Sequence, residues 1–262
     1  MRSDFAEPVH TMQEAFFLGE SKHRVFANYH PAVRGDGRIL AIICPPLFFE
    51  YMHVHSALRN LAIRLSEGGQ NVLRLDYRGT GDSFGDLEEF SVSDWVDDIK
   101  LAVQEGRKIS GSDGVHVVAV RAGALLACRS MDALDGVRRL VLWDPVADGA
   151  TYLRELRDVQ ARCIEQHIYM SRADRVEAAQ ECAGHRVSNR MIEDFAALDA
   201  NVYASIPKNK LYVICTREAG GLHLNGHSRV VIPPACDWAA IENRITIHPV
   251  MSELLRACLA LS

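Results

Sequence analysis

The stretch Val115–Ala127, VHVVAVRAGALLA, decides the fold of this chain. Its first part, Val115 to Val120, is almost entirely apolar and rich in β-branched residues, as in a strand that is buried on both faces. The sequence then changes at once to small residues, which favour a helix over Ala122–Ser130. We therefore expect a buried strand that turns sharply, at Arg121, into a helix.

Arg121 stands where a strand–turn–helix of this kind would carry a nucleophilic serine. Small residues, Ala119 and Gly123, occupy the tight positions on either side of it. A guanidinium stays protonated and offers only hydrogen-bond donors, so it cannot attack a carbonyl carbon. The sequence therefore excludes an acyl-enzyme on residue 121.

A cation at the start of a helix needs an anion nearby, because the helix dipole disfavours an exposed cation there by about 0.3–1 kcal/mol. Two kinds of partner fit Arg121: a side-chain carboxylate, or the carboxylate or phosphate of a ligand. The sequence leaves both open. We further expect the guanidinium to face solvent, so that Arg121→Ala abolishes ligand binding but leaves the protein folded.

The remaining pattern is typical of an α/β protein. Alternating segments on both sides of Ser21–Lys22 predict an antiparallel hairpin. Strands and helices then alternate, which predicts a mostly parallel central sheet with helices on both faces. The expected strands are Arg38–Cys44, Asn71–Asp76, Arg139–Trp143, Leu211–Thr216 and Arg244–His248, and the expected helices are Val54–Glu67, Ser91–Gly106 and Met251–Leu261.

The segment from Asp144 to Lys208 interrupts this alternation with three polar helical stretches and no strand. An excursion of this length between two strands is typical of a cap inserted over a site. No linker-like stretch divides the chain. We therefore expect a single domain over residues 1–262, with residues 145–208 as a small helical cap.

Composition excludes several classes of function. The net charge of −5 is spread along the chain without a basic block, which disfavours nucleic acid or an anionic membrane surface as a partner. No apolar run approaches the roughly 18 residues of a membrane span, and the N-terminus lacks a secretory pattern, so a cytoplasmic location is expected. Seven cysteines without a CxxC pair predict reduced thiols, and we expect neither a metal site nor a cofactor.

Five motifs resemble the α/β-hydrolase superfamily, in particular its serine aminopeptidase S33-type and exosortase-system-associated branch. They are FFLG (16–19), VFANYHPA (25–32), CPPLFFEY (44–51), LDYRGTGDS (75–83) and LVLWDPVADGATYLREL (140–156), of which LDYRGTGDS is the most specific. The resemblance covers nearly the whole chain and implies the α/β-hydrolase fold. Some members of this branch carry arginine in the turn between this strand and this helix, which is called the nucleophile elbow. The resemblance implies a fold more firmly than a function.

Such a fold places a general base at the end of its last strand, where this chain has His248. A histidine there suits proton transfer at neutral pH, although it equally fits a residue that caps or packs beside the final helix. Glu218 and Asp144 are the two candidates for the acid that orients it, and Asp144 is also a candidate partner of Arg121. Either carboxylate fits a simple loop residue equally well.

The loop Pro45–Glu50 lies where these folds supply one amide of an oxyanion hole, near Leu47 and Phe48, and Ala122 would supply the other. Backbone donors are unaffected by a change of side chain, so this anion pocket is expected beside Arg121. Glu50 matches a glutamate of the branch, and it equally fits a salt-bridging role.

A second GxSxG pattern occurs at Gly81–Gly85 around Ser83, but no helix follows it directly, so we interpret it as a glycine-rich turn. Our leading hypothesis is a protein that either binds an anionic or acyl-type small molecule or catalyses an atypical, water-mediated or lyase-like reaction through His248, with Arg121 holding a carboxylate or phosphate of the ligand. The alternatives are a catalytically silent scaffold with a closed cavity, and a hydrolase of esters, thioesters or amides with a relocated nucleophile, Ser83 or Cys44. Homo-oligomerisation is left open.

Overall fold

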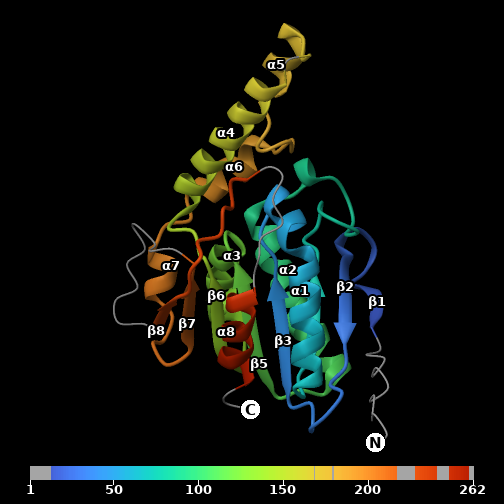
Figure 1. Cartoon of the computed structure of the whole chain (residues 1–262). Coiled ribbons are helices and arrows are strands. Elements are labelled where there is room, and N and C mark those ends of the chain that lie inside the picture. Colours follow the sequence, from blue (N-terminus) through green and yellow to red (C-terminus); the bar gives the residue numbers. More distant parts are fainter. Residues whose placement is uncertain (1–12, 168, 179, 217–227, 241–247, 260–262) are drawn as a thin grey trace, which may run out of the picture.

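A single eight-stranded sheet forms the centre of the computed structural model, which describes residues 13–167, 169–178, 180–216, 228–240 and 248–259 (Figure 1). The strands lie in the order β1-β2-β4-β3-β5-β6-β7-β8. β1 and β2 form the predicted antiparallel hairpin, β2 is antiparallel to β4, and all other pairs are parallel. The strand bounds are Glu14–Leu18, Val25–His30, Ile39–Cys44, Asn71–Leu75, Gly114–Val120, Val137–Trp143, Leu211–Cys215 and Ser228–Val231 for β1 to β8.

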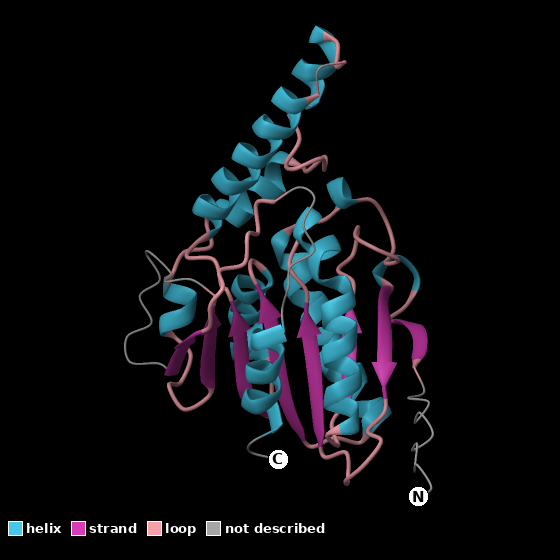
Figure 2. Ribbon diagram, viewed as in Figure 1, coloured by secondary structure: helices cyan, strands magenta, loops and turns pink. Residues whose placement is uncertain are grey.

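Helices cover both faces of the sheet (Figure 2). On one face lie α1 (Phe49–Glu67) and α8 (His248–Leu259), and on the other lie α2 (Val92–Ser110) and α3 (Gly123–Ser130). Strand β5 serves both layers, because its successive side chains point to opposite faces: Val117 packs with the α2 and α3 layer and Val118 with the α1 and α8 layer. This double burial explains the continuous apolar run that the sequence shows.

Between β6 and β7 the described chain forms helices and no strand of the sheet, as the sequence predicts. There are four helices and not three: α4 (Gly149–Gln166), α5 (Arg172–Ala178), α6 (Asn189–Ala196) and α7 (Asn201–Ala204). Asp148 caps the first of them, since its Oδ1 accepts a hydrogen bond of 2.6 Å from the Thr151 amide. In Figure 1, α4 and α5 extend away from the sheet, beyond the carboxyl ends of the parallel strands.

The described sheet ends in β8, a strand that the sequence did not predict. The predicted strand Arg244–His248 falls largely on residues 241–247, which lie outside the described part, and His248 is the first residue of α8. β8 is a four-residue edge strand whose side chains are mostly exposed, so it lacks the apolar pattern that identifies a strand. Helix α1 begins at Phe49, five residues before the expected start.

None of the helices in the described ranges is both long and apolar enough to span a bilayer.

Candidate functional site

Arg121 lies in the tight turn between β5 and α3, as the sequence predicts. Its φ is 52°, a left-handed conformation that is strained for any residue but glycine, and its amide donates a hydrogen bond of 3.0 Å to the Trp143 carbonyl. Gly123 allows the turn to pack closely, because a Cβ at this position would lie 2.4 Å from the Pro45 carbonyl oxygen. This turn between β5 and α3, the elbow, therefore packs directly against the loop that follows β3.

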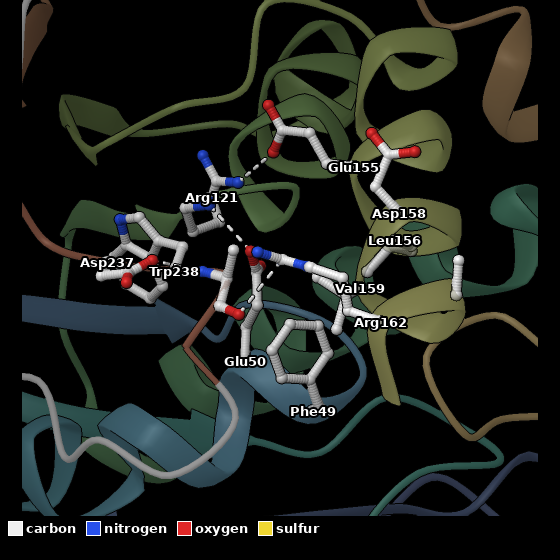
Figure 3. Close-up of a pocket in the computed structure, with 12 residues that line it drawn as sticks. Phe49, Glu50, Arg121, Glu155, Leu156, Asp158, Val159, Arg162, Asp237 and Trp238 are labelled. Atoms are coloured by element: carbon white, nitrogen blue, oxygen red, sulfur yellow. Dashed lines mark hydrogen bonds and ion pairs between the residues drawn. The ribbon is translucent and has the colours of Figure 1, made fainter. Parts of the chain in front are cut away.

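The guanidinium of Arg121 is held between two carboxylates (Figure 3). Its Nε donates to Glu50 Oε1 at 2.9 Å, and its Nη2 donates to Glu155 Oε2 at 2.6 Å. The expectation of a solvent-facing guanidinium is wrong, since only 5% of the Arg121 side chain is exposed. Of the two partners that the sequence left open, the structure shows the side-chain carboxylate, and it shows two of them.

Aromatic rings complete the surroundings of this guanidinium. The Tyr152 hydroxyl donates a hydrogen bond of 3.0 Å to Glu50 Oε2, so both oxygens of Glu50 are engaged. The guanidinium carbon lies 5.9 Å from the centre of the Tyr152 ring and 5.4 Å from that of Trp238. Both distances are within the range of cation–π attraction. Arg121 is thus a fixed part of the pocket floor.

The pKa values of this group follow from burial and from the ion pairs. Burial opposes the charged form of Arg121, but Glu50 and Glu155 outweigh that effect and raise its pKa, so the cation persists at every working pH. Burial raises the pKa of Glu50, and the ion pair with Arg121 acts against that shift. Within this ion-paired group, Glu50 is therefore the residue that would take up a proton if Arg121 were removed.

A cavity of about 520 Å³ opens beside the ion pairs. Its apolar wall consists of Phe49, Leu156, Val159 and Trp238, and its charged lining includes Arg121 and both glutamates (Figure 3). Asp158, Arg162 and Asp237, whose side chains are exposed, add further charges. The volume lies within the range of about 300–1,000 Å³ that is usual for small-molecule sites.

Asp144 binds Thr216 and Trp238. Its Oδ1 accepts from the Thr216 amide at 2.6 Å, and its Oδ2 accepts from the Thr216 hydroxyl at 2.6 Å and from Trp238 Nε1 at 2.9 Å. The idea that Asp144 pairs with Arg121 is therefore wrong. Its carboxylate ties the ends of β6 and β7 to the indole that lines the cavity.

The other two candidates for a catalytic pair cannot be placed. Glu218 lies outside the described residues, and so does the side chain of His248, whose backbone begins α8. Their roles as acid and base remain predictions. The described residues include no group of three or more His, Cys, Asp or Glu side chains arranged to hold a metal ion.

The predicted oxyanion loop adjoins the elbow. Leu47 and Ala122 are both buried, and Phe48, with a φ of 55°, is the last residue before α1. The contact between the Gly123 backbone and the Pro45 carbonyl brings the two loops together. Whether the Leu47, Phe48 and Ala122 amides serve a common anion remains a prediction.

Both alternative nucleophiles have structural roles. The Ser83 hydroxyl accepts a hydrogen bond of 2.7 Å from the Phe26 amide and donates one to the Asp76 carbonyl, so it links β2 to the loop after β4. Cys44 is fully buried at the end of β3, and burial raises the pKa of its thiol to about 12. A thiol that stays protonated at neutral pH is a poor nucleophile.

Glu155 and Tyr152 are further residues of the site, which the sequence alone does not identify. They are three positions apart on α4, so they point to the same side of that helix, toward Arg121. This spacing was visible in the sequence, but nothing local indicated which side of α4 would meet the elbow.

No protein-family model and no curated protein matches the sequence. Solved structures with a similar fold include a serine hydrolase without a lid from Xanthomonas campestris, with 15% identity over 94% of each chain and a TM-score of 0.58. A proline iminopeptidase from Mycobacterium smegmatis is 13% identical, with 95% of this chain and 100% of that chain covered and a TM-score of 0.59. Est1E from Butyrivibrio proteoclasticus is 12% identical, with 92% and 95% covered and a TM-score of 0.60. Likeness at these identities shows a shared fold.

Proposed function

The chain has the α/β-hydrolase fold, and we propose that it uses the pocket of that fold to bind an anionic or acyl-type small molecule without forming an acyl-enzyme. The observation that supports this proposal is the guanidinium of Arg121, which stands in the turn between β5 and α3 and lines a cavity of about 520 Å³. A cavity of that size with an apolar wall and a few fixed polar groups has the composition of a ligand site.

Covalent catalysis at the elbow is excluded by the chemistry of arginine. The hydroxyl of Ser83 is engaged in two hydrogen bonds, and Cys44 is buried and protonated, so a relocated nucleophile is disfavoured. We therefore expect any reaction in this pocket to be water-mediated or lyase-like, with His248 as its base.

We further propose that residues 145–208 act as the cap of this pocket. Six residues of α4, among them Glu155, Leu156 and Val159, line the cavity, while Phe49 and Glu50 of the first turn of α1 and Arg121, directly after β5, provide its floor. A cap of this kind determines which ligands fit.

A silent scaffold is the second candidate, and one observation favours it: Arg121 is buried and its charge is already met by two carboxylates. The two candidates differ in what the cavity does. A binding protein responds to a small molecule there, whereas a scaffold does not.

The experiment combines a serine probe with a thermal-shift screen of small carboxylates, phosphates and acyl compounds. A fluorophosphonate should label no residue, and a ligand at about 100 times its Kd should stabilise the fold by about 2.7 kcal/mol. Ala161→Trp places a large side chain at an exposed position of the cavity lining and should remove the shift. Gln166→Trp, at an exposed position of the same helix, should keep it.

Either of two results overturns the proposal. A screen in which no compound shifts the Tm of the wild type supports the silent scaffold. Stoichiometric labelling of Ser83 supports the relocated nucleophile.

A further inference from the structure

We propose that Glu155 occupies the place of a ligand's carboxylate, and that the ligand of this cavity is a monocarboxylate with an apolar tail that takes over the Nη2 side of Arg121. This inference rests on the proposed function and names the ligand class. It starts from an asymmetry between the two carboxylates that meet Arg121.

Glu50 is a permanent partner. Its side chain is 3% exposed, its two oxygens bond to Arg121 and Tyr152, and it belongs to the first turn of α1. Moving this carboxylate would leave a buried hydroxyl and a buried cation without their acceptor. A ligand therefore cannot take the place of Glu50.

Glu155 is a replaceable partner. Its side chain is 42% exposed, and its bond to Arg121 involves only Oε2. A half-exposed carboxylate regains water when it leaves an ion pair, so the loss of this contact costs little. Rotation of the Glu155 side chain into solvent would uncover Arg121 Nη2 toward the cavity that both residues line.

The exchange leaves the charges around Arg121 unchanged. Glu50 and Glu155 together place two negative charges against one positive charge. A ligand carboxylate in place of that of Glu155 preserves this balance. An amide carbonyl accepts a hydrogen bond from Arg121 but brings no negative charge, so the bond is weaker, and an amine sets a second cation against the guanidinium. Guanidinium groups bind carboxylates strongly because two N–H groups can engage both oxygens.

Helix α4 does not need to move for this exchange. Tyr152, Leu153, Leu156 and Val159 are all buried beneath the same stretch of the helix. The apolar wall of Phe49, Leu156, Val159 and Trp238 is left to receive the tail of the ligand. The geometry thus favours an aliphatic or aromatic chain that ends in one carboxylate.

The test measures the Kd of octanoate, octanamide and octylamine by calorimetry for the wild type, Glu155→Gln and Asp158→Asn. Glu155→Gln removes the competing charge and should tighten octanoate about tenfold, a change of about 1.4 kcal/mol, with little effect on octanamide. Asp158→Asn removes an equal charge from the next turn of α4, where the side chain lines the cavity but does not bond to Arg121. It should tighten octanoate less than about threefold.

The outcomes separate this inference from the proposed function. Equal effects of the two substitutions on octanoate would show a general field effect and overturn the exchange. Equal binding of octanoate and octanamide to the wild type and to Glu155→Gln would also overturn it, while the pocket would remain a ligand site. If none of the three compounds binds to any of the three proteins, both the exchange and an acyl-type ligand are wrong. Glu155→Ala should reproduce the result of Glu155→Gln.

Discussion

At the scale of single residues, Arg121 combines two costs that the rest of the fold must offset. Its left-handed backbone costs on the order of 1–3 kcal/mol, and its guanidinium is almost entirely removed from water. Two carboxylates and two aromatic rings meet that charge. The side chain at the turn between β5 and α3 is therefore a structural element as well as part of the cavity lining.

Arg121→Met should lower the free energy of unfolding by about 3–5 kcal/mol, because it leaves the Glu50 carboxylate buried without its counter-charge. The loss should be smaller at pH 5 than at pH 8, since burial raises the pKa of Glu50 and an acidic medium neutralises it. Urea unfolding at the two pH values measures both effects. The matched variant Glu50→Gln/Arg121→Met should recover more than half of the loss. If the double variant is as unstable as Arg121→Met, the ion pair is not the cause.

At the scale of secondary-structure elements, the pocket is built where strands end. The elbow follows β5, the loop before α1 follows β3, and Asp144 follows β6. These three strands are neighbours and parallel, so the residues that follow them lie together at the carboxyl ends of the strands. Asp144 then binds Thr216, directly after β7, and Trp238. One carboxylate thus joins two strand ends to a wall of the cavity.

Asp144→Ala should cost about 3 kcal/mol or more of stability, because it leaves three donors without their acceptor and each unmet group costs about 1–3 kcal/mol. It should also change the tryptophan fluorescence, since the Trp238 indole loses its hydrogen bond of 2.9 Å to the Asp144 carboxylate. Thr216→Val, which removes one hydroxyl from the same network, is the milder control and should cost about 1 kcal/mol. A loss below 0.5 kcal/mol for Asp144→Ala, on the order of an ordinary surface change, would contradict this account.

At the scale of the whole molecule, the sheet buries two histidines in neutral form. Burial, assisted by nearby arginines, lowers the pKa values of His30 and His116 from 6.5 to about 4. Because the folded-state pKa of each histidine lies below its unfolded value, the two neutral histidines contribute their full stability above about pH 6.5. This contribution is lost as the pH falls toward 4. Asp98 has the opposite sign, since burial raises its pKa from 3.8 to about 6, so its contribution is present at low pH and is lost as the pH rises through 6.

Because the effect of two histidines exceeds the opposite effect of one aspartate, we expect the free energy of unfolding to fall as the pH is lowered from 6.5 to 4. Each histidine should contribute on the order of 2 kcal/mol to this fall. His30→Leu should flatten it, since both ring nitrogens of His30 are buried and have no hydrogen-bond partner within the described residues. Urea unfolding at pH 7.5 and pH 5 tests this, with the exposed His167→Leu as the control. An unchanged slope for His30→Leu would assign the acid sensitivity to other groups.

The sequence by itself determined the central architecture and the chemistry available at residue 121. Val115–Val120 and the small residues after Arg121 are local patterns, and local patterns are sufficient to identify a buried strand, a sharp turn and the helix that follows. The chemistry of arginine then excludes an acyl-enzyme on residue 121, wherever the side chain points. These conclusions need no knowledge of distant contacts.

Only the tertiary structure decided which groups meet Arg121 and where the sheet ends. Glu50 and Glu155 are 71 and 34 residues away from it in the sequence, and Asp144, much closer along the chain, turns to Thr216 instead. The edge strand β8 has no apolar alternation because its neighbours bury little of it. Ion pairs and edge strands depend on which segments the fold brings together, and the residue pattern of one segment does not contain its partner.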